Sequence, residues 1–244
     1  MVSSEATLHA ATELHTHLNP LKGSTMNRWF ARIAALLLLG FSVAANAAGA
    51  APFQEGAGYN KLPSAQPVGH KGKIVVTEFF WYDCPHCFEF EPLLEAWAKK
   101  QPADVVLERV PVAFAPQYVA QQKLYYALKA LGKVDALQGA IFNAIHVQHI
   151  PLGTPEQMAN WLVGRGIPKA TFMNAYNSFG VQMETKRATQ MVTDYQITGV
   201  PTLAVGGMYT ASASMPETPN NEKVLQAVDF LVQQLRAGMA KTAK

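Results

Sequence analysis

Residues 75–91 read VVTEFFWYDCPHCFEFE, and this stretch decides how the rest of the chain is interpreted. Its first half is rich in β-branched and aromatic residues, which is typical of a strand covered on both faces. Pro85 suits the first turn of a helix, where the N–H that proline lacks is not needed. Apolar residues then recur at helical spacing, at Phe90, Leu93, Leu94 and Trp97. The stretch therefore predicts a strand, a Cys-Pro-His-Cys turn and a helix in direct succession.

Both cysteines of the chain, Cys84 and Cys87, lie in this turn. A thiolate on Cys84 would be stabilised there, because a helix start offers unpaired backbone N–H groups and the positive end of the helix dipole. His86 can add a hydrogen-bond donor or, when protonated, a positive charge. One unit of pKa lowering favours the thiolate by about 1.4 kcal/mol, which is roughly 30 mV for a two-electron couple. Such a site stabilises the reduced form and makes the disulfide a stronger oxidant.

The segments 78–80 and 84–91, together with Gly-Val-Pro-Thr at 199–202, resemble the DsbA family of periplasmic thiol–disulfide oxidants. The similarity extends from about residue 69 to residue 237, and it is sharp only at these motifs. That family is itself a reference case of a low-pKa, oxidising cysteine pair. The resemblance implies an α/β protein, a thioredoxin fold with an inserted all-helical domain.

The resemblance also implies a mechanism in which Cys84 is the attacked cysteine and Cys87 the resolving one. A substrate thiolate attacks Cys84 and forms a mixed disulfide, and a second substrate thiolate then releases the oxidised product. The substrates would be newly exported proteins in the periplasm. Reoxidation would come from a membrane-embedded, quinone-linked partner of the DsbB type. We expect a monomer that needs no organic cofactor and no metal.

Two other functions stay open at this point: an isomerase or reductase of the same fold, and a non-catalytic module with a structural disulfide. Residues 48–70 show no clear periodicity and are expected to form an extended leader. An isomerase usually has a separate dimerisation domain, for which this leader leaves no room. A zinc site is disfavoured because zinc normally takes four ligands and only His86 lies near the cysteines. The formal net charge of +3 over 244 residues gives no reason to expect nucleic-acid binding.

Glu78 is an acid within an otherwise apolar strand, six residues before Cys84. A buried carboxylate is costly unless it is partnered or neutral, so a raised pKa would let Glu78 relay a proton to or from Cys87. The alternative is that Glu78 faces a solvent-exposed edge of the sheet, a wet edge, and has no role. Glu91 resembles an acidic position of the family, and a solvated surface role is equally open for it.

In the family, the proline that matches Pro201 is cis and faces the cysteines, and the backbone before it is free to pair with a substrate strand. The resemblance therefore implies a cis Val200–Pro201 bond and a substrate-binding role for both residues. Asp83 precedes Cys84 directly, and a carboxylate there disfavours a thiolate. His146 and His149 are interpreted as surface residues.

The rest of the mature chain fits an insertion into an α/β fold. Strands are expected at 73–82 and 104–114, joined in parallel by the helix that ends near Lys100. Five helices are expected at 118–131, 134–147, 155–163, 168–179 and 181–195.

Strands at 202–205 and 208–210 flank Gly206-Gly207, which indicates a hairpin. A last helix begins at Asn220 or Asn221 and is expected to end by Gly238. We therefore assign residues 48–114 and 198–244 to the two parts of the thioredoxin-like domain and 115–197 to the helical insertion.

Residues 26–47 have the form of a secretory signal peptide. A short basic region precedes an apolar stretch, residues 33–43, that is too short to span a bilayer comfortably, and Ala45-Asn46-Ala47 fits a cleavage site. A retained membrane anchor is the alternative. Residues 1–25 precede an internal Met26 and are interpreted as an upstream extension outside the mature protein. Export matters because an oxidising compartment lets a cysteine pair remain a disulfide.

Overall fold

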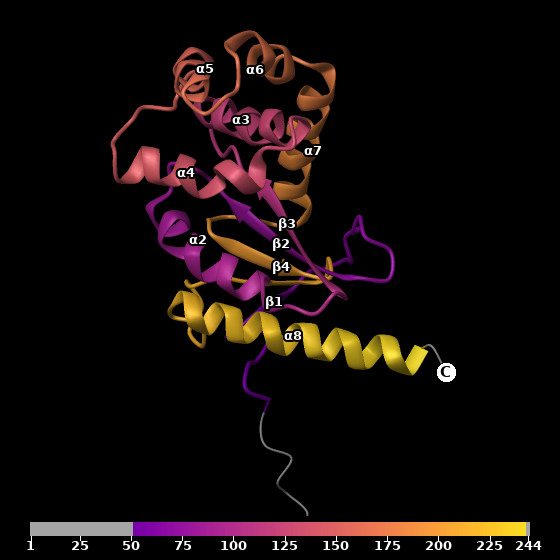
Figure 1. Cartoon of the computed structure of the whole chain (residues 1–244). Coiled ribbons are helices and arrows are strands. Elements are labelled where there is room, and N and C mark those ends of the chain that lie inside the picture. The colour runs from indigo at the N-terminus through magenta and orange to yellow at the C-terminus, as the bar shows by residue number, and fades with distance from the viewer. Residues whose placement is uncertain (1–50, 243–244) are drawn as a thin grey trace, which may run out of the picture. The chain divides into compact units, whose positions relative to one another are not determined.

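The protein is described here by a computed structural model of residues 51–242; the predicted upstream extension and signal peptide lie outside the described residues. One mixed sheet has the strand order β1-β5-β4-β2-β3. The strands are β1 (Asn60–Lys61), β2 (Ile74–Phe80), β3 (Val105–Pro111), β4 (Thr202–Val205) and β5 (Tyr209–Ala211). Figure 1 shows helices α2 (Pro85–Ala98) and α8 (Asn221–Thr242) beside this sheet.

Strand β2 is central, and all of its residues are buried. It pairs in parallel with β3, where Val76 lies opposite Leu107, and antiparallel with β4, where Val76 lies opposite Val205. The predicted parallel pairing is confirmed. A strand covered on both faces needs apolar side chains throughout, which is why Glu78 stands out.

The helices between β3 and β4 form the helical insertion, and each of the five expected helices is present. They are α3 (Val119–Ala130), α4 (Val134–His146), α5 (Pro155–Val163), α6 (Lys169–Tyr176) and α7 (Phe179–Asp194), preceded by a short 3-10 helix at Pro116–Tyr118. Figure 1 shows them gathered at the side of the sheet away from α8.

Two apolar clusters hold the layers together. One joins the sheet to α2 and α8 through Val76, Leu94 and Leu231. The other joins the end of β2 to the helical insertion through Phe80, Leu124 and Phe142. The Cys-Pro-His-Cys turn therefore lies where the sheet, α2 and the insertion meet.

The hairpin between β4 and β5 is confirmed. Gly206 and Gly207 have φ of +60° and +66°, the positive values that a tight hairpin turn requires. A Cβ on Gly207 would lie 2.2 Å from the carbonyl oxygen of Gln66. That close approach arises because Gln66 N–H donates to Gly207 O at 2.7 Å, which ties the N-terminal segment to the hairpin.

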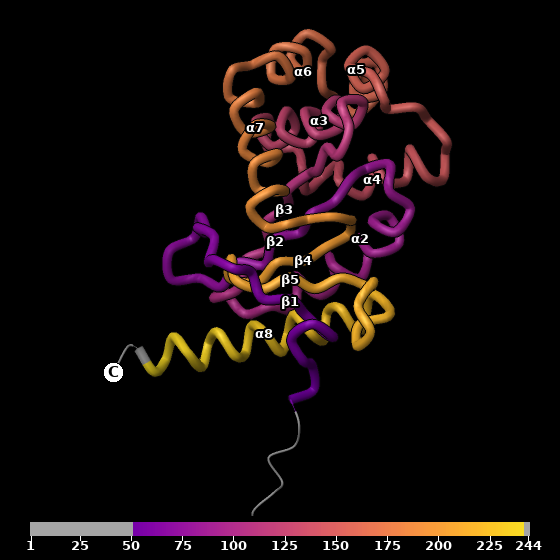
Figure 2. The backbone as a smooth tube through the Cα atoms, turned by 180° about the vertical axis from the view of Figure 1, so that it is seen from behind, coloured from indigo at the N-terminus to yellow at the C-terminus, as the bar shows by residue number. Residues whose placement is uncertain are grey.

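Two expectations about the ends of the fold are wrong. Residues 48–70 were expected to be an extended leader, but β1 within them pairs antiparallel with β5 (Figure 2). Helix α8 continues past Gly238 to Thr242. Gly238 does not adopt the left-handed conformation that ends helices, and good helix formers follow it. The predicted cap is confirmed, because the Asn220 side chain accepts from Lys223 N–H at 2.9 Å.

No helix within residues 51–242 is both long enough and apolar enough to cross a membrane.

Candidate active site

Cys84 is the N-cap of α2, and Pro85 occupies the first turn as predicted. The Cys84 N–H donates to Trp81 O at 3.1 Å, which closes a four-residue turn between β2 and α2. Its Sγ accepts from the N–H of Cys87 at 3.4 Å. Cys84 is only 7% exposed and Cys87 is fully buried. The sulfur of Cys84 therefore lies at the tip of the helix, where its own helix donates to it.

The two thiols differ in acidity. A hydrogen bond from the Cys87 side chain, followed by the N–H groups of Cys87 and His86, lowers the pKa of Cys84 to about 6, although burial opposes the shift. The pKa of Cys87 is raised, first by burial and then by Cys84. At neutral pH the thiolate form of Cys84 therefore predominates over the thiol. The site can hold one negative sulfur and keep the other protonated.

His86 lies on the solvent side of the helix tip. Its side chain is 78% exposed, and its Nδ1 lies 3.2 Å from Glu89 Oε2. The charge of His86 lowers the pKa of Cys84 less than the backbone N–H of His86 does. An exposed charge is screened by water and salt, which explains the order.

The Val200–Pro201 bond is cis, as the resemblance to the family implied. In its thiol form Cys84 donates to Val200 O at 3.6 Å. The segment just before β4 thus faces the reactive sulfur. A peptide that pairs with the backbone at Val200 would be brought directly beside Cys84.

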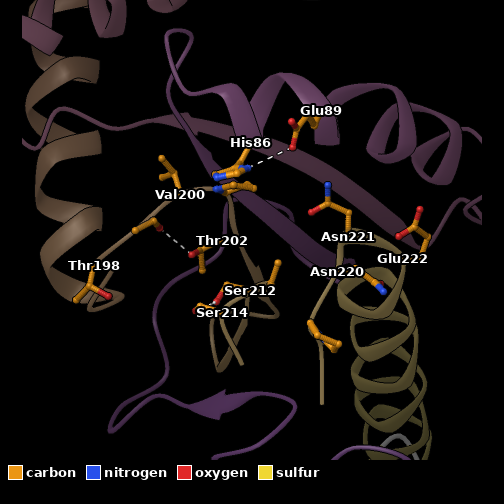
Figure 3. Close-up of a pocket in the computed structure, with 14 residues that line it drawn as sticks. His86, Glu89, Thr198, Val200, Thr202, Ser212, Ser214, Asn220, Asn221 and Glu222 are labelled. Carbon is orange, nitrogen blue, oxygen red and sulfur yellow. Dashed lines mark hydrogen bonds and ion pairs between the residues drawn. The ribbon is translucent and has the colours of Figure 1, made fainter. Parts of the chain in front are cut away.

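A groove of about 560 Å³ begins at this point. Figure 3 shows His86 and Glu89 of α2 on one side and Asn221 and Glu222 of α8 across from them. Most lining side chains are hydroxyl, amide or ionisable: His86, Glu89, Thr198, Thr202, Ser212, Ser214, Asn220, Asn221 and Glu222, with Val200 and Pro201 at the end beside Cys84.

Glu78 is fully buried and is bound by an arginine that the sequence analysis missed. Arg109 Nε donates to Glu78 Oε2 at 3.0 Å, and Arg109 Nη2 donates to Glu91 Oε1 at 3.2 Å and to Glu95 Oε1 at 2.6 Å. The wet-edge interpretation of Glu78 and the surface interpretation of Glu91 are therefore wrong. Arg109 lies directly opposite Glu78 in the β2–β3 register. The sequence did hold a signal for this contact, because Arg109 is a cationic residue within the apolar strand expected at 104–114.

Burial raises the pKa of Glu78 to about 8, even though Arg109 acts against the shift. Glu91 adds to the rise, because three carboxylates share one arginine. Glu78 Oε1 has no hydrogen-bond partner within the described part of the chain. The ionised form is thus poorly satisfied, and a neutral carboxyl group fits the site at neutral pH.

Helix α4 contacts both flanks of the Cys-Pro-His-Cys turn. Tyr82 Oη donates to Gln138 Oε1 at 2.7 Å, and His146 Nε2 donates to Tyr82 O at 2.8 Å. The His146 ring stacks on Phe88 with centroids 4.9 Å apart and planes 11° from parallel. The surface interpretation is wrong for His146 and correct for His149, which is exposed. Helical spacing alone could not reveal this contact, because it joins segments far apart in the chain.

Trp81 and Tyr82 have different surroundings. Tyr82 is 1% exposed and belongs to the core. Trp81 is half-buried, and its ring centroid lies 4.0 Å from that of Tyr118. Within residues 51–242, no group of three or more His, Cys, Asp or Glu side chains could hold a metal ion.

A Cys-x-x-Cys pair at the start of the helix after the central strand, opposite a cis-proline segment, defines a thioredoxin-type thiol:disulfide oxidoreductase. Residues 75–228 match the model of the DSBA-like thioredoxin domain. The chain therefore belongs to the DsbA family, as the resemblance implied, and it is an enzyme of thiol:disulfide exchange.

Relatives with this name cover most of the chain. The thiol:disulfide interchange protein DsbA of Burkholderia cepacia is 44% identical over 209 residues, which are 84% of this chain and 97% of the relative. The protein of that name from Pseudomonas aeruginosa is 38% identical over 195 residues, 80% of this chain and 92% of the relative.

Solved structures agree on the fold. The crystal structure of Pseudomonas aeruginosa DsbA aligns with a TM-score of 0.71 at 38% identity, covering 77% of this chain and 97% of that one. The oxidoreductase DsbA from Xylella fastidiosa aligns with a TM-score of 0.71 at 30% identity, covering 76% and 98%. The predicted thioredoxin fold with a helical insertion is confirmed.

Proposed function

We propose that the protein is a periplasmic thiol oxidase that donates a Cys84–Cys87 disulfide to reduced exported proteins. The observation that carries the proposal is the position of Cys84 Sγ at the N-cap of α2, where it accepts from the Cys87 N–H at 3.4 Å while Cys87 is buried. The pKa of Cys84 is accordingly lowered to about 6 and that of Cys87 is raised. A stabilised thiolate favours the reduced pair over the disulfide. Electrons therefore flow from client thiols to the enzyme.

In the first step a client thiolate attacks Cys84 Sγ, and the bond between the two enzyme sulfurs breaks. The electron pair goes to Cys87 Sγ, which takes up a proton because its pKa is raised. Glu78 is the proposed proton donor, since burial keeps it neutral near pH 7. Arg109, which donates to Glu78 Oε2, would stabilise the Glu78 carboxylate after it has given up its proton.

In the second step another client thiolate attacks the client sulfur of the mixed disulfide. Cys84 leaves as a thiolate, which the Cys87 N–H bond stabilises. The client gains one disulfide and loses two electrons, and the enzyme ends as a dithiol pair. A low thiol pKa makes Cys84 a good leaving group, so this step is fast.

Val200 and Pro201 are proposed to bind the client. The carbonyl oxygen of Val200 lies 3.6 Å from Cys84 Sγ, and an extended client segment can pair with the backbone there as an added strand. His86 and Pro85 complete the helix tip that the client meets.

The enzyme is proposed to act as a monomer without an organic cofactor or metal and to be reoxidised by a DsbB-like, quinone-linked membrane oxidase. Periplasmic localisation is supported by the predicted signal peptide at 26–47, with 1–25 as an upstream extension. We retain 48–114 and 198–244 as the two parts of the thioredoxin-like domain and 115–197 as the insertion.

The test uses the mature chain and a reduced peptide with two cysteines. The wild type should oxidise this peptide. With a second peptide that has one cysteine, so that no further client thiol can resolve the intermediate, Cys87→Ala should accumulate a stable mixed disulfide at Cys84 once the thiol is activated, whereas Cys84→Ala should form none. Equilibration of the wild-type pair with glutathione should give a potential well above that of reducing thioredoxins, which lie at about −270 mV. A potential at or below that value would assign the protein to reduction instead.

A further inference from the structure

We propose that His146, in the helical insertion, is a positioning residue that fixes the turn carrying Cys84. The proposal rests on the thiol oxidase function above and adds a residue far from the motif in sequence. It concerns the geometry of the turn and does not make His146 a catalytic residue.

The hydrogen bond that closes the turn does not use the carbonyl of Tyr82. The bond from Cys84 N–H to Trp81 O closes the turn, so the peptide between Tyr82 and Asp83 lies at its centre. The orientation of this central peptide distinguishes the common turn types. His146 Nε2 lies 2.8 Å from Tyr82 O and holds that peptide in one orientation.

The chemistry of this contact fixes the proton on the ring. A carbonyl oxygen can only accept, so Nε2 of His146 must carry the hydrogen that it donates. The ring is held in place by stacking on Phe88, which follows Cys87 directly. His146 therefore touches the residue two positions before Cys84 and the residue one position after Cys87.

Helix α4 supports this arrangement along one face. Gln138, Phe142 and His146 are spaced four residues apart, and all three contact Tyr82. Gln138 and Phe142 are almost fully buried, so the helix is anchored and His146 is presented from a rigid element. The insertion thus holds the loop in front of the cysteines from outside the thioredoxin-like part of the chain.

Loss of the donor should weaken the reactive site. With Tyr82 O released, the central peptide can rotate, and Cys84 Sγ no longer stays aligned with the Cys87 N–H. The thiolate is then less stabilised. We expect the Cys84 pKa to rise by about half to one unit and the equilibrium constant with glutathione to fall about three- to tenfold, since one unit is tenfold.

Two substitutions separate the donor from the ring in the full mature chain. His146→Phe keeps the aromatic stack and removes the donor, so it should show the full rise in the Cys84 titration midpoint. His146→Gln places an amide N–H near the position of Nε2 and should restore most of the wild-type value. His149→Asn is the matched control, because His149 is exposed and asparagine tolerates its φ of +55°.

The readouts are thiolate absorbance against pH, the glutathione equilibrium and urea unfolding. A purely structural role would lower the unfolding midpoint of His146→Phe and leave its titration unchanged, which would overturn the proposal. A titration of His146→Gln that matches the raised midpoint of His146→Phe would overturn it too, because a restored donor would then not restore the titration.

One measurement needs no variant, so misfolding of the substituted chains cannot remove the test. Nitrogen NMR of the wild-type imidazole should place the neutral ring's proton on Nε2 of His146, and a proton on Nδ1 would refute the proposal. Failure of the oxidase function would appear separately, as a wild-type pair that does not oxidise peptides.

Discussion

Substitution of Glu78 by glutamine should change how the stability of the protein depends on pH. Burial raises the pKa of Glu78 to about 8 in the folded chain, against an ordinary 4.5. The unfolded chain therefore releases this proton from about pH 4.5 upward, whereas the folded chain keeps it until about pH 8. As pH rises through this window, the wild type loses stability from Glu78, and Glu78→Gln does not.

The magnitude follows from the width of the window. Each unit corresponds to about 1.4 kcal/mol, so the wild type should lose about 3 to 5 kcal/mol relative to Glu78→Gln between pH 4.5 and pH 8. The value of about 8 already includes the opposing effect of Arg109, and the lower figure corresponds to a folded-state pKa about one unit lower. Glutamine has nearly the same shape and carries no charge at any pH, so it isolates the titration.

Urea unfolding of both reduced proteins at several pH values measures this difference. Glu55→Gln serves as control, because Glu55 is exposed and its substitution should leave the pH profile parallel to that of the wild type. A difference between wild type and Glu78→Gln that stays flat from pH 5 to pH 8 would refute the view that Glu78 is buried as a neutral acid.

Three further outcomes are expected. The Cys84 thiolate should titrate near pH 6 when followed by absorbance, and an ordinary midpoint near 9 would contradict the site geometry. The stability that this thiolate gives the dithiol form should be lost as pH falls through about 6. Arg109→Met should lower the free energy of unfolding by about 3–5 kcal/mol, because it leaves buried carboxylates without their partner; a neutral effect in urea unfolding would show that the cluster is dispensable. Gly207→Ala should cost about 1–3 kcal/mol or more, because its Cβ would meet Gln66 O at a φ of +66°, whereas Gly139→Ala, with open space around it, should be neutral or stabilising in the same assay.

The motif and the order of elements could be predicted from sequence because their signals are local. The β-branched and aromatic run around Glu78 and the proline and glycine positions between helices depend on near neighbours in the chain. The hairpin at Gly206-Gly207 is also local, since the turn itself demands positive φ. Each of these elements is present in the structure.

The missed features depend on contacts between distant segments. Strand β1 has two residues, too few for a period, and exists because β5 offers a free edge. The partner of Glu78 follows from strand register, which places Arg109 opposite it. His146 reads as an ordinary residue in a helix end until the fold brings it to Tyr82 O.

The groove beside Cys84 bears on how client proteins would bind and dissociate. Its walls are mainly hydroxyl, amide and ionisable groups, which exchange bonds with water at little net gain. For the client binding proposed above, such a surface should tolerate many client sequences and hold each of them only briefly. Selection would then depend on whether a client exposes a flexible cysteine, and rapid dissociation would leave the enzyme free for the next chain.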